Sequence, residues 1–155
     1  MTMAKAARYM RDESALDNGQ AIDVGPEGDK FTITTRGFTT AYIDRLAALQ
    51  RAAAIRLNTG LPPASTDRVT PDTLPPSVQD ECQAQALAEK CLLDISGLEN
   101  MDGSPMTIEQ FKAAILKRAN MGLLVLALQA AGSVGMASKA LLEDAEKNSQ
   151  PPSAG

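Results

Sequence analysis

Histidine is absent from this 155-residue chain, and its absence removes several kinds of chemistry. Histidine is the commonest general base, the usual partner of a catalytic Ser or Cys, and a frequent transition-metal ligand. The chain also lacks a phosphate-binding glycine-rich loop with a Lys, and no dinucleotide-binding fingerprint follows a predicted strand. We therefore expect no catalytic residues, no cofactor and no metal site, and a protein that is not an enzyme.

Cysteine is nearly as scarce, with Cys82 and Cys91 as the two examples. Two cysteines are too few for a disulfide framework, and alone they cannot build a structural zinc site. On one predicted helix, nine residues apart, they would lie about 13 Å apart along the axis at about 1.5 Å rise per residue. A disulfide cannot span that distance. The prediction is two free, buried thiols.

Aromatic residues make up only 3% of the chain, and Trp is missing. The core must therefore be built from Leu, Ile, Val, Met and Ala, a composition that favours helices over sheets. A chain of this length suits one domain. The predicted fold class is mainly α, a small helical domain of about four helices with a short N-terminal β-hairpin.

An excess of positive charge is also lacking, because the net charge is −4 and the pI is about 4.8. Binding to nucleic acid needs a concentrated basic surface, so a nucleic-acid partner is not expected. Lys5, Arg8 and Arg11 near the start are not followed by the apolar core of a secretory signal.

One stretch without charge, residues 119–138, is long enough to cross a bilayer. It contains Asn120, Gln129 and three glycines, however, and its strongly apolar part covers only 121–128. A helix buried inside a small domain explains the stretch better, so no membrane association is expected. A small holin-like membrane protein stays open as the less favoured alternative.

Turn formers and proline divide the chain. Residues 1–18 are polar and predict a flexible N-terminal arm or a frayed short helix, followed by a single mainly helical domain over 19–146. Alternating apolar residues over 22–35, around a Gly-Pro-Glu-Gly-Asp turn, predict the hairpin. A helix capped by Thr39 or Thr40 runs to about Leu57, and 58–76 is a proline-rich linker or loop.

The second half of the chain predicts three further helices. Ser77, with Asp80 as acidic partner, caps a helix that runs to about Leu93, and a turn region follows over 94–106. Thr107 and Gln110 form a second capping box that opens the next helix. The last helix covers about 120–146, with a bend near 132–135, and 147–155 is predicted to be a disordered tail.

The acidic turn region superficially suggests a calcium site, because Asp94, Ser96, Glu99, Asn100 and Asp102 lie close together in sequence. Their spacing does not fit the helix–loop–helix calcium motif, and no Glu closes the loop at its twelfth position. A tight turn built on Asp102 and Gly103 is the better interpretation.

The segment from Cys91 to Leu116 resembles one found in several families of tail assembly chaperones of long-tailed bacteriophages. In those families a helix ends in an aspartate, an apolar-glycine turn leads to an Asp-Gly-x-Pro step, and Thr or Ser caps a helix that carries Phe or Leu. Members often have Trp where Ile95 stands here. The matching residues in this chain are Asp94, Gly97, Leu98, Asp102, Gly103, Pro105, Thr107 and Phe111.

The resemblance implies a non-enzymatic chaperone of tail morphogenesis in the host cytoplasm. Such proteins bind the tape-measure protein, keep it soluble and help to recruit tail tube subunits. In many such phages a programmed frameshift near the end of the gene appends a second domain, which the protein sequence does not reveal. Homo-oligomerisation stays open, and a head–tail connector or neck component is the main alternative.

The last predicted helix carries more apolar side chains than one buried face needs, and methionines adapt to varied surfaces. A client that is long, helical and apolar would be met by such a face. The competing interpretation is that these residues fill the core. The candidate partner-binding residues are Met121, Leu124, Leu128 and Met136.

Overall fold

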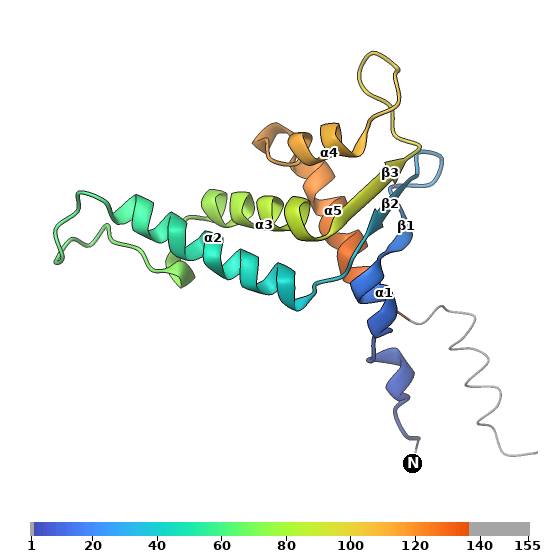
Figure 1. Cartoon of the computed structure of the whole chain (residues 1–155), viewed down its shortest axis with the longest axis horizontal. Coiled ribbons are helices and arrows are strands. Elements are labelled where there is room, and N and C mark those ends of the chain that lie inside the picture. The colour runs from blue at the N-terminus through green and yellow to red at the C-terminus, as the bar shows by residue number, and fades with distance from the viewer. Residues whose placement is uncertain (1, 137–155) are drawn as a thin grey trace, which may run out of the picture.

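The computed structural model describes residues 2–136, which form five α-helices and a three-stranded antiparallel sheet and are about 51% helical. The predicted mainly α class with some β structure is confirmed at this level, with one more helix than expected. Figure 1 shows the elements in order: η1 (Ala6–Arg8), α1 (Glu13–Asn18), β1 (Gln20–Val24), β2 (Phe31–Thr35), α2 (Thr40–Asn58), η2 (Pro71–Thr73), α3 (Pro76–Lys90), β3 (Leu92–Ser96), α4 (Ile108–Ala114), η3 (Arg118–Asn120) and α5 (Met121–Ser133).

The predicted hairpin is part of a larger sheet. β1 and β2 pair antiparallel, and β3 adds a third strand along the other edge of β2. The prediction that a helix continues to Leu93 and that 94–106 is only a turn region was therefore wrong. Lys90 ends α3. Exposed Asp94, buried Ile95 and exposed Ser96 alternate as on a half-buried strand, and a register shift between Thr34 and Thr35 places buried Leu92 opposite Thr35.

The two faces of the sheet differ in chemistry. Ile22, Ile33 and Ile95 lie side by side in register, and Ile33 and Ile95 are buried in the main core. α5 packs against β1 and β2, and together with Phe111 of α4 its apolar residues complete this core. Asp23 and Thr32 belong to the opposite face, where the Thr32 hydroxyl donates to Asp23 at 2.7 Å. One face of the sheet is thus apolar and buried and the other is polar, as in antiparallel sheets with one side exposed to solvent.

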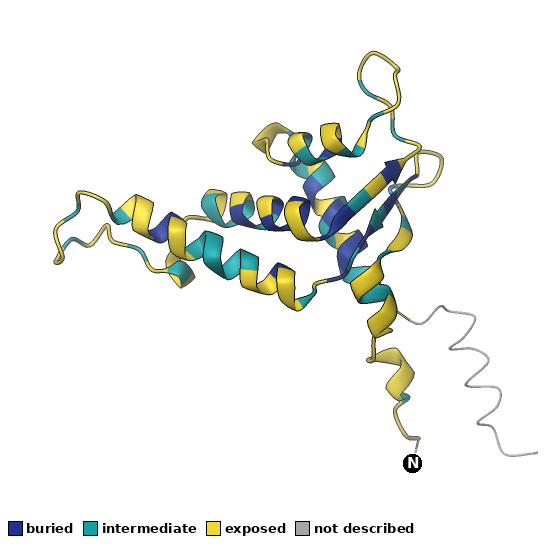
Figure 2. Ribbon diagram, viewed as in Figure 1, coloured by how far each residue is buried: buried dark blue, intermediate teal, exposed yellow. Residues whose placement is uncertain are grey.

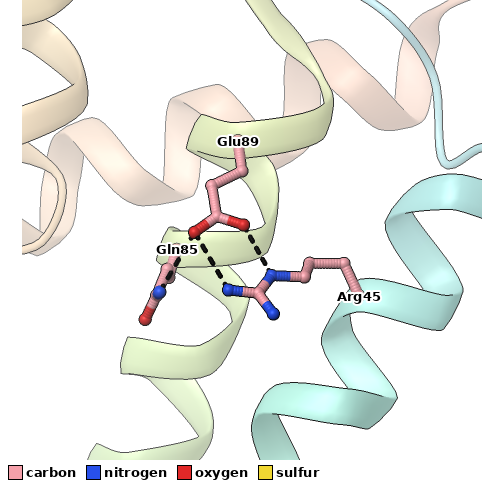
Figure 3. Close-up of polar contacts among 3 residues, drawn as sticks. All are labelled: Arg45, Gln85 and Glu89. Atoms are coloured by element: carbon pink, nitrogen blue, oxygen red, sulfur yellow. Dashed lines mark hydrogen bonds and ion pairs between the residues drawn. The ribbon is translucent and has the colours of Figure 1, made fainter.

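α2 and α3 form an antiparallel pair that extends away from the sheet (Figure 1). The Thr39 hydroxyl caps α2 by accepting from the Tyr42 N–H at 3.3 Å, as predicted. Between the helices, the Arg45 guanidinium donates to both carboxylate oxygens of Glu89, at 2.5 and 3.2 Å, and Gln85 donates to the same carboxylate at 3.1 Å (Figure 3). The Arg45 hydrogen bonds lower the pKa of Glu89.

The proline-rich loop between α2 and α3 is tied down at its base. Asn58 donates to the Val69 carbonyl at 2.7 Å and accepts from the Val69 N–H at 2.8 Å. Leu74 is buried in a second small core with Ala53, Ala54 and Cys82. Ser77 does not cap α3, contrary to prediction, because the helix already begins at Pro76, whose missing N–H costs nothing at that position.

Residues 1–18 were predicted to be a mobile arm or a short helix, and within them Glu13–Asn18 is a helix capped by Asp12. The Gly37 N–H donates to the Leu16 carbonyl at 3.1 Å. α5 does not bend and continue through 132–135 but ends at Ser133, followed by extended Val134 and by Gly135 at φ 77°. The rest of the predicted last helix, 137–146, and the predicted tail 147–155 lie outside the described residues.

Candidate functional site

The residues that carry the family resemblance lie in one continuous strand–loop–helix unit. Asp94 is exposed on β3, opposite Thr34 of β2, and Gly97 follows the end of that strand. The chain then leaves the sheet as a loop over 98–106, which projects at the top of Figure 1. α4 begins directly after it.

The 98–106 loop is held in one shape by its own hydrogen bonds. The Met106 N–H donates to the Leu98 carbonyl at 2.8 Å, and the Asn100 N–H donates to the Ser104 carbonyl at 2.7 Å. Gly103 adopts φ 85°, a left-handed conformation that suits glycine, so the predicted Asp-Gly turn is present. At the tip, Met101 is fully exposed.

Asn100 connects the loop to the helix that follows. Its side-chain amide donates to the Ser104 hydroxyl at 3.1 Å, to the Pro105 carbonyl at 3.3 Å and to the Gln110 side-chain carbonyl at 3.0 Å. The same Gln110 oxygen accepts from the Thr107 N–H at 3.0 Å, while the Thr107 hydroxyl accepts from the Gln110 N–H at 3.2 Å. The predicted capping box is confirmed, and Asn100 extends it into the loop.

Phe111 fastens this unit to the rest of the protein. Its side chain is completely buried, and its ring meets the Phe31 ring edge-on with the centroids 6.3 Å apart. Edge-to-face contacts of this kind are favourable beyond the burial of the rings. The exposed loop therefore rests on a helix that the core holds in place.

The acidic side chains of the loop do not gather into a cluster of metal ligands between residues 2 and 136. The Asp102 carboxylate accepts from the Ser104 hydroxyl and N–H, which lowers the pKa of Asp102. Within the described part of the chain, no group of three His, Cys, Asp or Glu side chains could hold a metal ion.

Both cysteines are buried free thiols, as predicted. Burial raises the pKa of Cys91 to about 11, and the Cys91 thiol donates to the Gly37 carbonyl at 3.3 Å. Burial also raises the pKa of Cys82. Because the thiolate is the nucleophilic form, these protonated thiols are poor nucleophiles at neutral pH.

The four candidate partner-binding residues do not form one surface. Leu124 is 3% exposed and packs in the main core, which fits the interpretation that it fills the core. Met121 and Leu128 are half-buried against the same core. Met136 is 51% exposed but lies beyond the other end of α5, next to Met10 and Arg11. α5 has few polar residues, Gln129 and Ser133 at its C-terminal end, so periodicity gave little indication of which side chains face inward.

Other exposed apolar side chains were not predicted as contact residues. Met101 stands at the loop tip, and Ile55 is 71% exposed on α2. The N-terminal arm carries Met3, Tyr9 and Met10, each more than two-thirds exposed. In the arm and the loop, the sequence signal that could have identified these contact candidates is a large apolar residue within a polar stretch.

The described residues define a small, mainly helical protein with a protruding, internally braced loop and several exposed apolar side chains. Between residues 2 and 136, no helix has both the length and the apolar character needed to cross a membrane. No protein-family model, curated protein or solved structure matches this chain. Its function must therefore be inferred from these surfaces.

Proposed function

We propose that this chain is a non-enzymatic assembly chaperone of phage tail morphogenesis that acts in the host cytoplasm. It binds the tape-measure protein, keeps it soluble and recruits tail tube subunits. The observation that carries the proposal is the unit from Asp94 to Phe111. The residues that carry the family resemblance form a loop held by its own hydrogen bonds and a capped helix that Phe111 anchors in the core. They therefore act together to position the exposed loop.

The surface chemistry supports a role in holding another chain. Met101 presents an unbranched, adaptable side chain from a loop that its own hydrogen bonds keep in shape. A loop ordered in advance loses little conformational freedom on binding, which favours affinity. Contact with an apolar helical client would cover this side chain.

Co-expression with an aggregation-prone segment of the tape-measure protein tests the proposal. The wild-type chain should raise the soluble fraction of the client, and Met101→Ser should lower that effect without unfolding the chaperone. Ile55→Ser is the matched control, because it also removes an exposed apolar side chain but lies on α2. A client that stays insoluble beside the folded wild-type chain would contradict the proposal.

The head–tail connector makes a different prediction in the same experiment. It would form a closed ring of fixed, large mass and leave the solubility of the tape-measure segment unchanged. Light scattering on the purified chain, measured beside the co-expression, separates the two functions.

A further inference from the structure

The N-terminal arm, residues 2–11, projects from the domain with most of its side chains exposed (Figures 1 and 2). Met3, Tyr9 and Met10 are 84%, 75% and 68% exposed. Three large apolar side chains thus lie in the open on a short segment. Exposed large apolar side chains that gather on one segment are candidates for protein interaction.

The base of the arm is held firmly, so its outward direction is a property of the fold. The Asp12 N–H donates to the Gly135 carbonyl at 2.9 Å, and the Gly135 N–H donates to the Gln20 side chain at 3.0 Å. A Cβ on Gly135 would come within 3.0 Å of the Asp12 backbone, so only glycine allows this approach. The arm therefore starts at a fixed point and leads away from its own domain.

Charge indicates what the arm meets. Residues 2–11 contain three basic residues, Lys5, Arg8 and Arg11, and no acidic residue. Residues 12–136 contain 16 acidic and 10 basic residues, which gives them a net charge of −6. The body of this same protein is thus electrostatically complementary to the arm. Because the arm projects from its own domain (Figure 1), the acidic surface that would receive it lies on another chain, and a second copy of this protein carries such a surface.

A recess suited to the arm lies at the opposite end of β1. It has a volume of about 540 Å³ and is bounded by the β1–β2 turn, the residues after β3 and the first half of α5. Leu98, Leu123 and Leu126 supply apolar wall, and Asp29 and Glu99 bring negative charge. Lys30 also lines it, but its ammonium group is paired with Glu27 at 3.0 Å.

We propose that the arm of one copy docks into this recess of a second copy, with Tyr9 and Met10 against the leucines and Arg11 beside Asp29 and Glu99. Tyr9, Met10 and Arg11 lie within three residues of the anchored Asp12, so the two copies meet close to the base of the arm. The contact is head-to-tail, so repetition adds copies one after another and the mass grows with concentration, whereas a connector ring has one fixed mass. This inference does not depend on the proposed chaperone function.

Light scattering after size-exclusion chromatography of the full chain, over a range of concentrations, tests the arrangement. The wild-type mass should rise with concentration, and salt should weaken the association because opposite charges meet. Tyr9→Ser with Met10→Ser removes the arm contact, and Asp29→Lys with Glu99→Lys removes the acidic side of the recess. Each double variant alone should be monomeric.

Mixing the two double variants gives the sharpest result. The intact arm of the recess variant fits the intact recess of the arm variant, so the mixture should form dimers and nothing larger. Arg11→Glu, combined in one chain with Asp29→Lys and Glu99→Lys, should restore association because the charges are then exchanged. Ile55→Ser is the control, and its mass should equal that of the wild type. Circular dichroism establishes that each variant is folded.

Three results would overturn the proposal. The first is a wild-type chain that stays monomeric up to millimolar concentration. The second is an oligomer whose mass the arm substitutions do not change. The third is a mixture of the folded double variants that yields no dimer, which would mean that the arm meets a different surface or a different protein.

Discussion

Replacing Phe111 by Ala removes the side chain that fastens α4, and with it the 98–106 loop, to the sheet. The ring is completely buried and touches Phe31 edge-on. Truncating a buried Phe to Ala costs about 3–5 kcal/mol, because apolar contact is lost and a cavity remains. The ring pair accounts for about 0.5–1.5 kcal/mol of that loss. We expect the free energy of unfolding to fall by about 4 kcal/mol.

Urea denaturation followed by circular dichroism measures this change. With a slope of about 2 kcal/mol per molar urea, a loss of about 4 kcal/mol lowers the midpoint by about 2 M. Phe38→Ala is the control, since Phe38 is 41% exposed and loses less contact when truncated. Its cost should be about 1–2 kcal/mol.

A double-mutant cycle with Phe31→Leu and Phe111→Leu isolates the ring pair. The two substitutions should fail to add, with a coupling of about 0.5–1.5 kcal/mol. The reasoning is refuted if Phe111→Ala costs no more than Phe38→Ala, because Phe111 would then not anchor the unit.

Three further outcomes follow from the geometry. Asn100→Ala removes three side-chain hydrogen bonds, so limited proteolysis should cut within 98–106 faster than in the wild type; an unchanged rate would mean that these bonds do not order the loop. Burial raises the pKa of Cys91 to about 11, and the unfolded thiol, with a pKa of about 8.5, loses its proton first as pH rises. The free energy of unfolding should therefore be constant up to about pH 8.5 and decrease as the pH rises toward 11. In Cys91→Ala the urea midpoint should not show this decrease between about pH 8.5 and 11. Arg45→Ala should lower the urea midpoint only slightly, and the effect should disappear in concentrated salt, because the pair with Glu89 is more than one-third exposed.

Local sequence signals correctly predicted the N-terminal caps of two helices and the main turns. Thr39 begins α2, and Thr107 with Gln110 begins α4, because a cap depends on residues within three positions of the helix start. The turn at Gly103 and the pairing of β1 with β2 also follow from near neighbours in sequence. Ser77 misled because the adjoining Pro76 can itself start a helix.

β3 could not be recognised in the same way. Its five residues follow α3 almost directly, and their pattern is too short to separate a strand from the last turn of a helix. The strand exists because β2, about sixty residues earlier in the chain, offers an edge for pairing. Such a contact depends on how the chain folds back on itself.

The amino-acid sequence by itself determined the absence of histidine chemistry, the helical character, the caps and the braced turn that carries the family resemblance. Tertiary structure alone decided which apolar side chains are available to a partner. Leu124 and Val125 of α5 are neighbours of similar apolar character, and packing against β1 and β2 buries Leu124 while Val125 stays 44% exposed. Burial is a property of the assembled layers, so a mostly apolar helix encodes it only weakly in its own sequence.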